Sequence, residues 1–255
     1  MKFASWNVNS LRVRLTQVLD WLCADSIDVL CLQETKLVDD DFPVEAFKEI
    51  GYKAVYAGQK TYNGVATISK HFAYEIVADL PGMQDPQRRL LGVTISDIRV
   101  LNVYIPNGQK VGSEKYAYKL AWIEKLQAYV ATQLKAYRHF LLLGDFNIAP
   151  EDADVHDPEL WAGKVLFSGP ERQAFSDLIG HGLHDTFRKF EQPEKTFSWW
   201  DYRSGSFRRN LGLRIDHILC SDAMYEYCLS STIDFEPRKL ERPSDHAPIV
   251  AEFNL

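Results

Sequence analysis

The chain has 255 residues, of which 46% are apolar and 25% charged, and its formal net charge is −6 at pH 7. This composition is that of an ordinary globular protein and excludes a disordered chain. The net charge argues against a polyanionic partner, but the basic residues gather in 87–89, 203–209 and 238–242, away from the acidic runs at 39–41 and 151–159. This separation allows a positive face on an acidic protein.

The sequence predicts an intracellular protein with reduced thiols. Its first residues, MKFASWNVNS, lack the apolar segment of a secretory signal, and an apolar run such as FLLL is far short of the ~20 residues of a membrane span. We therefore expect a cytoplasmic protein with no membrane partner. The cysteines at positions 23, 31, 220 and 228 form no C-x-x-C pair and are interpreted as reduced core thiols, which disfavours a zinc site.

Strands and helices are expected to alternate along the chain. Alternating or continuous apolar patterns predict strands in residues 2–8, 27–34, 52–58, 64–70, 99–107, 139–147, 197–203, 214–221 and 247–255. Apolar residues three and four positions apart predict helices in residues 14–26, 115–137 and 171–182. No Gly-, Pro- or Ser-rich linker interrupts the chain, so we expect one domain over residues 1–255. The pattern indicates an α/β protein with layered sheets and outer helices.

Polar side chains gather where predicted strands end. They are Asn7, Asn9, Glu34, Tyr104, Asn107, Asp145, Asn147, Asp216, Asp245 and His246. Taken singly, most have a structural explanation, because Asn and Asp form turns and helix caps, and a lone His is more often a core residue than a catalyst. A glutamate inside VLCLQE is harder to explain, since it is costly unless paired or metal-bound. Because a sheet brings strand ends to one edge, the set predicts a single acidic, amide-rich cleft.

The residue types in this cleft indicate hydrolysis of a phosphate ester. Glu34, Asp245 and Asn7 are oxygen ligands that suit Mg²⁺ or Mn²⁺ better than zinc. Asp145 and Asn147 are two apart on a strand and share a face, where they can orient and deprotonate a water. A cation, a positioned nucleophile and support for the leaving oxygen are what phosphoryl chemistry requires. No G-x-S-x-G or P-loop motif is present to favour acyl transfer or nucleotide binding.

Nine short motifs extend the argument beyond single residues. The segments WNVNSLR, LQETK, GQKTYNGVA, QRR, NVYIPNG, LLLGDFNIAP, FSWWDYRS, GLRIDHIL and PSDHAPI occur in the order seen in the exonuclease III family of AP endonucleases, part of the endonuclease/exonuclease/phosphatase superfamily. The sequence resembles that family from residue 2 to about residue 253. The resemblance implies a DNase I-like fold, a four-layer α/β sandwich of two packed mixed β-sheets flanked by helices.

The resemblance also implies a metal site and a water-activating pair. Glu34 resembles the principal metal ligand, and Asn7 and Asp245 would lie near the metal, which is expected to be Mg²⁺ with Mn²⁺ as a substitute. Asp145 resembles the residue that activates water or protonates the leaving group. Asn147 resembles its orienting partner.

Four more residues resemble the groups that contact the scissile phosphate. His246 with Asp216 resembles a dyad at the phosphate, and the Asp216 carboxylate can hold the imidazole in one tautomer. Tyr104 and Asn107 resemble phosphate-side donors. The sequence leaves open whether Asp145 or His246 is the general base.

Further positions match segments that contact DNA in the family. Trp199 resembles the aromatic wall of a pocket for a flipped-out abasic sugar, with Leu213 on another wall, although a core role is the alternative for both. Segments expected to follow the phosphate backbone contain Arg88, Arg89, Arg203, Arg208 and Arg209. The loop at residues 161–173 is expected near DNA, where its bulk would influence the choice between internal abasic sites and 3′ ends.

The family resemblance implies a Mg²⁺-dependent phosphodiesterase of DNA repair. Such an enzyme cleaves 5′ to abasic sites, removes 3′-blocking groups and degrades duplex DNA from 3′ ends. The expected partner is double-stranded DNA with abasic sites or 3′ ends, which would hold the protein, as a monomer, at the nucleoid.

Two alternatives remain. A catalytically silent nucleic-acid-binding regulator on the same scaffold would lack at least one catalytic residue, and every one is present here. A phosphatase of the same superfamily acting on lipid or inositol phosphates is disfavoured because FSWWDYRS and GLRID match the DNA enzymes.

Overall fold

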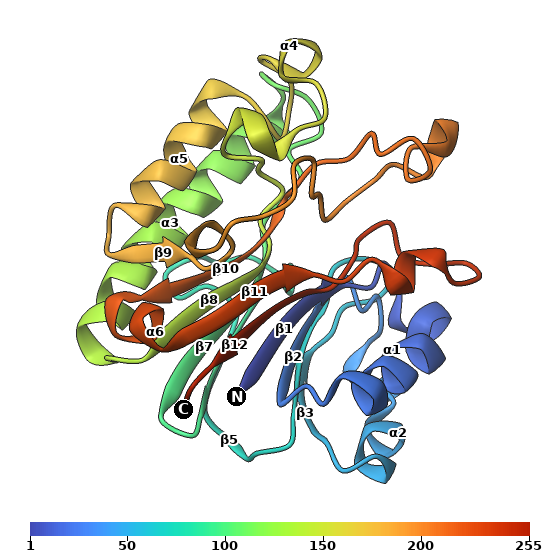
Figure 1. Ribbon diagram of the computed structural model, residues 1–255. Helices are drawn as coiled ribbons and strands as arrows, with labels where there is room; N and C mark the ends of the chain where they lie inside the picture. The colour runs from blue at the N-terminus through green and yellow to red at the C-terminus, as the bar shows by residue number, and fades with distance from the viewer.

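The computed structural model describes residues 1–255 and contains two six-stranded sheets (Figure 1). The strand order in the first sheet is β11 (Cys228–Ile233), β12 (Ile249–Phe253), β1 (Lys2–Asn7), β2 (Val29–Gln33), β4 (Val65–Ser69) and β3 (Lys53–Ala57). In the second sheet it is β5 (Ala73–Ala78), β6 (Leu90–Ile95), β7 (Ile98–Tyr104), β8 (Phe140–Asp145), β10 (Asp216–Ser221) and β9 (Leu183–Asp185).

The centre of each sheet is a parallel pair of strands. β1 runs parallel to β2 and β7 runs parallel to β8, whereas all other neighbours are antiparallel. A parallel pair requires a crossover connection, and here each crossover is a helix. The helices are α1 (Leu11–Asp25), α2 (Val44–Glu49), α3 (Glu114–Ala136), α4 (Pro158–Trp161), α5 (Gly169–Ile179) and α6 (Asp222–Tyr227). Four of the predicted polar residues lie at or next to the carboxyl ends of these parallel pairs, namely Asn7, Glu34, Tyr104 and Asp145.

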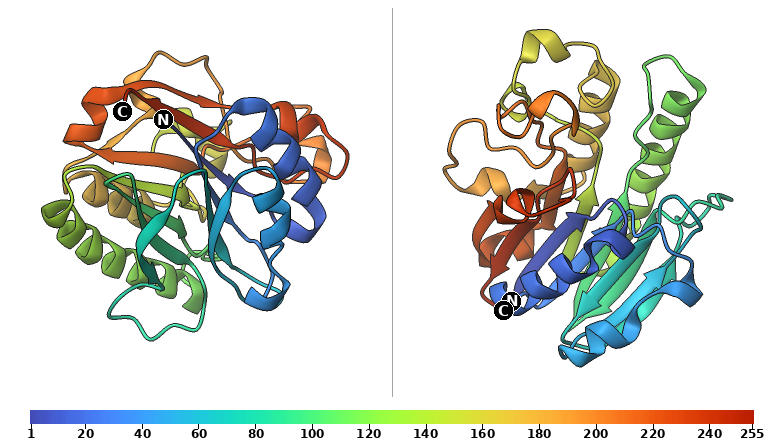
Figure 2. Two further views of the ribbon diagram at one scale, coloured as in Figure 1. Left: turned by 90° about the horizontal axis from the view of Figure 1, so that it is seen from below. Right: turned by 90° about the vertical axis from the view of Figure 1, so that its right-hand side faces the viewer.

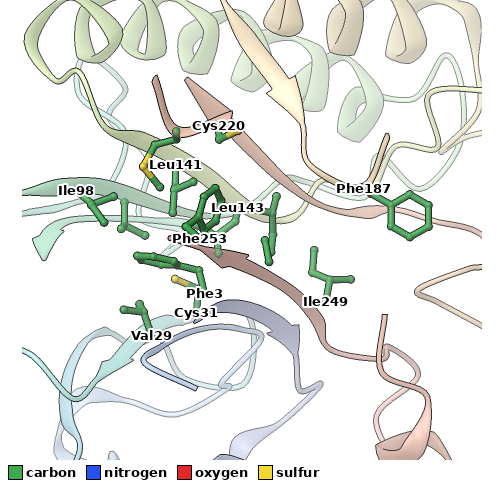
Figure 3. Packing of buried hydrophobic residues seen from close by; sticks show 14 of the residues in the cluster. Phe3, Val29, Cys31, Ile98, Leu141, Leu143, Phe187, Cys220, Ile249 and Phe253 are labelled. Carbon is green, nitrogen blue, oxygen red and sulfur yellow. The ribbon is translucent and has the colours of Figure 1, made fainter. Parts of the chain in front are cut away.

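Three apolar clusters hold four layers together. The central cluster lies between the sheets, where Phe3 and Val29 of the first sheet meet Leu141 and Leu143 of the second (Figure 3). A second cluster packs α1 and α2 on the outer face of the first sheet, and a third packs α3 and α5 on the outer face of the second (Figure 2). The four-layer α/β sandwich expected from the sequence is therefore confirmed.

The longest helix begins and ends close to its predicted bounds. Ser113 caps α3 by accepting a hydrogen bond from the Tyr116 amide at 3.2 Å. Trp122, Ile123 and other residues of the helix are buried against the second sheet. Lys119 is also fully buried on this face, which no hydrophobic pattern predicts.

Some predicted elements were wrong or missed. Residues 197–203 form no strand, because only Trp199 makes isolated bridges, to Leu213 and His246. The sequence analysis also missed β5, β6, β9, β11, α2, α4 and α6. Several of these are too short to show a period, and β5 is largely exposed at a sheet edge, so it lacks the apolar alternation of a half-buried strand.

The cysteines are free, as the sequence predicted. Cys31, Cys220 and Cys228 are buried, but Cys23 is exposed on α1, so the core interpretation is wrong for that residue. Burial raises the pKa of the Cys31 thiol to about 12, which makes it unreactive. None of the helices combines the length and the apolar composition needed to cross a lipid bilayer.

The glycine before Asp145 is required by the close approach of two strands. Gly144 has φ 152°, and a Cβ there would lie 1.8 Å from the carbonyl oxygen of Val103 on β7. Any side chain must therefore push β8 away from β7 at the position that carries Asp145.

We predict that Gly144→Ala lowers the free energy of unfolding by about 2 kcal/mol or more, because the strand pair must shift or adopt a strained backbone. Urea denaturation measures this change. The control is Gly169→Ala at the start of α5, where an added Cβ meets nothing within 4 Å and the expected change is within about 0.5 kcal/mol. Equal stability of the two variants would contradict the prediction.

Candidate active site

Side chains from both sheets converge beyond the ends of their central strands. Asn7 ends β1, Tyr104 ends β7 and Asp145 ends β8, while Glu34 directly follows β2. Asp216 instead begins β10, which runs antiparallel to β8 so that Asp216 lies opposite Asp145. The long connections between β9 and β10 and between β11 and β12 extend past the same edge (Figure 1). The sheet topology thus brings these polar side chains together at one edge of the two sheets.

One buried amide joins the carboxylates of the two sheets. The Asn7 Nδ2 donates hydrogen bonds to Glu34 Oε1 and to Asp145 Oδ2, both at 2.9 Å. The Asn7 Oδ1 accepts from the Asn9 backbone amide at 2.9 Å. Asn7 is fully buried, and its oxygen is already engaged, so its visible role is to orient the two carboxylates.

Glu34 and Asp245 are linked through a lysine and a second asparagine. Lys36 Nζ lies 2.9 Å from Glu34 Oε2 and donates to Asn9 Oδ1 at 2.5 Å. Asn9 Nδ2 in turn donates to Asp245 Oδ1 at 3.0 Å, and Trp199 Nε1 donates to Asp245 Oδ2 at 3.0 Å. The sequence analysis assigned no role to Lys36, although it stands in the LQETK motif.

This arrangement keeps both acids charged. Burial raises the pKa of Glu34, but the Lys36 ammonium and the Asn7 amide outweigh burial and hold the pKa below its ordinary value. Burial likewise raises the pKa of Asp245, but His246 and hydrogen bonds from Asn9 and Trp199 outweigh burial and hold the pKa below its ordinary value. Ionised oxygen ligands fit a hard dication such as Mg²⁺, and the Lys36 ammonium, held by oxygens of Glu34 and Asn9, shows that a cation is accommodated here.

Asp145 is held by asparagines on its other side. Asn147 donates to Asp145 through its backbone amide at 2.9 Å and through its side-chain Nδ2 at 3.1 Å. The Asn147 backbone has φ 51°, and its side-chain oxygen accepts a hydrogen bond from Asn107 Nδ2 at 2.9 Å. The two asparagines thus fix the carboxylate that the sequence singled out.

Tyr104 is a protonated donor at the rim of this group. Burial, together with the charges of Glu34 and Asp145, raises the pKa of Tyr104 well above its ordinary value. The Arg89 guanidinium lies 4.6 Å from the centre of the Tyr104 ring. The tyrosine hydroxyl therefore keeps its proton near the two carboxylates.

His246 forms the predicted dyad with Asp216. His246 Nδ1 lies 2.9 Å from Asp216 Oδ2, which also accepts a hydrogen bond from the Ser198 hydroxyl at 2.6 Å. His246 Nε2 lies 3.8 Å from Asp145 Oδ2. Burial lowers the pKa of His246, but the carboxylates of Asp216 and Asp145 outweigh burial and raise it to about 10. Burial raises the pKa of Asp145 to about 7, even though His246 opposes this.

Asp145, Asp216 and His246 form a second cluster able to hold a metal, since one ligand atom of each lies within 4.8 Å of the others. This set differs from the predicted ligands Glu34, Asn7 and Asp245. The imidazole Nδ1 faces Asp216 at 2.9 Å and Nε2 lies 3.8 Å from Asp145 Oδ2, so the same three groups can also share protons.

The predicted DNA-contacting arginines fall into three groups. Arg89 lines a cleft of about 660 Å³ that also contains Tyr104 and Asn107. Arg88 is paired with Asp79, and Arg203 lies 2.6 Å from Asp201, so these charges are partly neutralised within the protein. The remaining arginines, Arg208 and Arg209, are exposed on the connection that leads to β10.

The two predicted pocket walls differ in exposure. Trp199 is half-buried, whereas Leu213 is fully buried in a cluster with Leu166 and Phe167 of the loop at residues 161–173. The loop whose bulk was expected to influence substrate choice therefore packs in the same cluster as Leu213.

Known proteins resemble this chain in sequence and in fold. The sequence pattern of the Endonuclease/Exonuclease/phosphatase family matches residues 4–246. An exodeoxyribonuclease III from Haemophilus influenzae is 37% identical over 266 residues, which cover 99% of this chain and 100% of that protein. A solved 3′ phosphatase from Neisseria, bound to a product DNA hairpin, has a TM-score of 0.98 and 46% identity. A solved AP endonuclease from Archaeoglobus fulgidus has a TM-score of 0.96 and 38% identity, and both structures are covered completely, as is this chain.

We predict that Asp216→Asn shifts the pKa of His246 strongly downward, because the nearest carboxylate that stabilises the imidazolium is removed. NMR of the imidazole nitrogens checks this: the wild-type ring stays doubly protonated at pH 8, whereas the variant ring loses a proton below that pH. Asp222→Asn is the control, since Asp222 contacts the exposed His184 at 2.6 Å instead. A His246 titration that is unchanged in Asp216→Asn would refute the assignment.

Proposed function

The chain belongs to the endonuclease/exonuclease/phosphatase family, and on this premise we propose that it is a DNA-repair nuclease of the exodeoxyribonuclease III type that uses Mg²⁺. It hydrolyses phosphodiester bonds in double-stranded DNA. Its reactions are incision 5′ to abasic sites, removal of 3′-blocking groups and 3′→5′ degradation. The resemblance to the exonuclease III family stated from the sequence motifs is confirmed by the relatives.

One observation carries the proposal: a single amide joins an acid from each sheet. Asn7 Nδ2 bonds both Glu34 and Asp145, and Asp145 in turn faces His246. This brings an ionised acid, an acid with a raised pKa and a protonated imidazole into one buried group. General base, phosphate donor and cation ligand are thus within reach of one phosphate.

Glu34 and Asp245 would hold the Mg²⁺, with Asn7 beside them, and Mn²⁺ could substitute because the ligands are oxygens. When bound, the cation neutralises negative charge on the phosphoryl group and on the departing 3′-oxygen. A cation held by Glu34 would compete with the Lys36 ammonium for the same carboxylate.

Asp145 and His246 divide the proton transfers between them. A general base must be deprotonated, and the pKa of Asp145 near 7 allows this at neutral pH, whereas the pKa of His246 near 10 keeps the imidazole charged. We therefore assign Asp145 as the base that takes a proton from the attacking water, oriented by Asn147. His246, Tyr104 and Asn107 donate hydrogen bonds to the phosphoryl oxygens.

The substrate is held mainly through its phosphates. Arg89 and Lys115 line the cleft beside Tyr104. Arg208 and Arg209 are exposed on the connection that leads to β10. Such contacts give affinity without reading base sequence, and they make an acidic protein able to bind DNA locally. The monomeric state, the cytoplasmic location and the association with the nucleoid stay predictions.

A three-substrate assay tests the function. The substrates are duplexes with an internal abasic analogue, a recessed 3′-hydroxyl and a 3′-phosphate, each with Mg²⁺, with Mn²⁺ and with a chelator. Cleavage that requires the dication is expected on at least one DNA substrate. Inositol phosphates are assayed in parallel, because turnover of these alone would favour the phosphatase alternative, and DNA binding without any turnover would favour the silent regulator.

We expect Glu34→Ala and Asp145→Asn to lower turnover roughly 100-fold or more, because each removes a group needed in the transition state. Affinity for the abasic duplex should stay within roughly threefold, since binding rests on phosphate contacts elsewhere. Single-turnover rates and fluorescence anisotropy give the two quantities. Wild-type-like cleavage by either variant would remove its assigned role.

Trp199→Ala should impair abasic incision roughly tenfold more than 3′-phosphate removal, since burying the apolar surface of the abasic sugar against the ring is worth about 1–2 kcal/mol. Because Trp199 also donates to Asp245, the ratio of the two activities is the measured quantity. Trp199→Phe keeps the ring and should keep the ratio. Tyr227→Ala, at an exposed aromatic on α6, is the control, and equal losses on both substrates would count against the pocket.

A further inference from the structure

A fully buried ion pair lies behind the active site, between α3 and α5. Lys119 of α3 and Glu171 of α5 are both completely inaccessible to solvent and contact each other directly. Burying two charges is costly and gives little net stability unless the remaining hydrogen-bonding groups are satisfied. The other hydrogen-bond partners of this pair therefore indicate why a lysine, rather than an apolar residue, occupies this buried position.

Both carboxylate oxygens of Glu171 accept hydrogen bonds from the loop that leads into α5. Its Oε1 accepts from the Leu166 backbone amide at 3.0 Å, and its Oε2 accepts from the Ser168 amide at 3.1 Å and the Ser168 hydroxyl at 2.5 Å. With Lys119 this makes four hydrogen bonds, the full capacity of a carboxylate. Glu171 is consequently fixed in place by α5 and by the loop before it.

The Lys119 ammonium donates its other two hydrogen bonds to two loops of the active site. Its Nζ donates to the backbone carbonyl of Asn147 at 2.6 Å and to that of Asn107 at 3.3 Å. Together with Glu171 these use all three ammonium protons. The two carbonyls belong to different loops, one after β8 and the other after β7, so the ammonium is the point at which the loops are tied together.

The loop after β7 lies directly on the lysine stem. Gly108 has φ 88°, and a Cβ at that position would lie 3.1 Å from Lys119 Cδ. A Cβ there would be closer to the stem than most real Cβ contacts, so the loop already lies against the lysine. The stem and the ammonium of Lys119 together determine how far the loop after β7 lies from α3.

The two tied asparagines are those that orient Asp145. Asn107 Nδ2 donates to Asn147 Oδ1 at 2.9 Å, and Asn147 donates to both oxygens of Asp145. Asn147 also keeps a left-handed backbone, φ 51°, which needs support from its surroundings. A continuous series of contacts thus runs from Glu171 through Lys119 to the carboxylate of Asp145.

We propose that Lys119 is a positioning residue for phosphodiester hydrolysis: anchored by Glu171, it holds the Asn107 and Asn147 carbonyls so that their amide side chains keep Asp145 aimed at the attacking water. The inference rests on the proposed function, because the alignment of Asp145 is read from turnover. Misplacing a catalytic group by about 1 Å can cost roughly 100-fold in rate.

The experiment compares Lys119→Met, Glu171→Gln and the double variant Lys119→Met/Glu171→Gln. Lys119→Met leaves a buried carboxylate unpaired, so it should lose both stability and kcat. The double variant removes that unpaired charge and should regain most of the stability. Its kcat should stay roughly 100-fold below wild type, with KM within about threefold, because no group replaces the ammonium at the two carbonyls. Glu171→Gln retains the lysine and should keep most of kcat.

A purely structural role predicts the opposite result for the double variant. If kcat recovers together with the melting temperature, the positioning role is wrong. Tyr116→Phe is the matched control, because it removes the 2.6 Å contact between the Tyr116 and Ser168 hydroxyls at the same helix junction without touching either asparagine. Its kcat should equal that of wild type.

A second readout separates this inference from the proposed function. NMR of the side-chain amides of Asn107 and Asn147 reports their order without any substrate. In the double variant we expect both signals to shift or broaden, and unchanged signals would overturn the inference. If the wild-type enzyme cleaves no DNA, the proposed function fails, while the amide signals still decide whether Lys119 holds the two loops.

Discussion

The two hydrogen bonds from Asn7 Nδ2 are the contact on which the site depends. They connect Glu34, delivered by the first sheet, to Asp145, delivered by the second. Two carboxylates this close repel each other unless donors and cations separate them. The amide can stand between them only because the central apolar cluster fixes the distance and the relative position of the sheets. The chemistry at the edge is therefore a consequence of packing in the interior.

Around that amide the protein arranges charges of opposite sign in alternation. Lys36 contacts Glu34, and His246 lies between Asp145 and Asp216. The outcome is a gradient of proton affinity in which Glu34 stays ionised, Asp145 titrates near neutrality and His246 keeps its proton. Groups whose environments separate their pKa values in this way can act as base and donor in one reaction. Holding them on strand ends keeps the geometry rigid.

Binding of DNA by a protein with a net charge of −6 also follows from local arrangement. Arg88 and Arg203 form ion pairs with neighbouring acids, which partly neutralise their charge. Arg89 instead stacks on the Tyr104 ring beside the cleft. Positive charge is thus available beside Tyr104 in the cleft, and net charge alone is a poor guide to the partner.

The prediction from sequence succeeded wherever a residue type and a short pattern were sufficient. Continuous apolar runs such as VLCLQE and LLLGD predicted the central strands, and the period of α3 predicted its helix, because both depend on local alternation. The ordered motifs also identified the family. The strand prediction for residues 197–203 was wrong because the backbone amides of its serine and tryptophans bond to Leu213 and Asp245, which are distant in sequence.

What only the tertiary structure decided is which of these residues touch and in which state of charge. No pattern in the sequence places Lys36 against Glu34, or buries Lys119 beneath Asn107 and Asn147. The first contact lies within one loop, and the second arises when α3 packs on the second sheet. The bond between Asn7 and Asp145 arises when the two sheets pack and bring together strand ends separated by more than a hundred residues. The sequence by itself determined the chemical groups and the family. The packing of the sheets determined their distances, and distance sets both the pKa of a buried acid and the position of a proton.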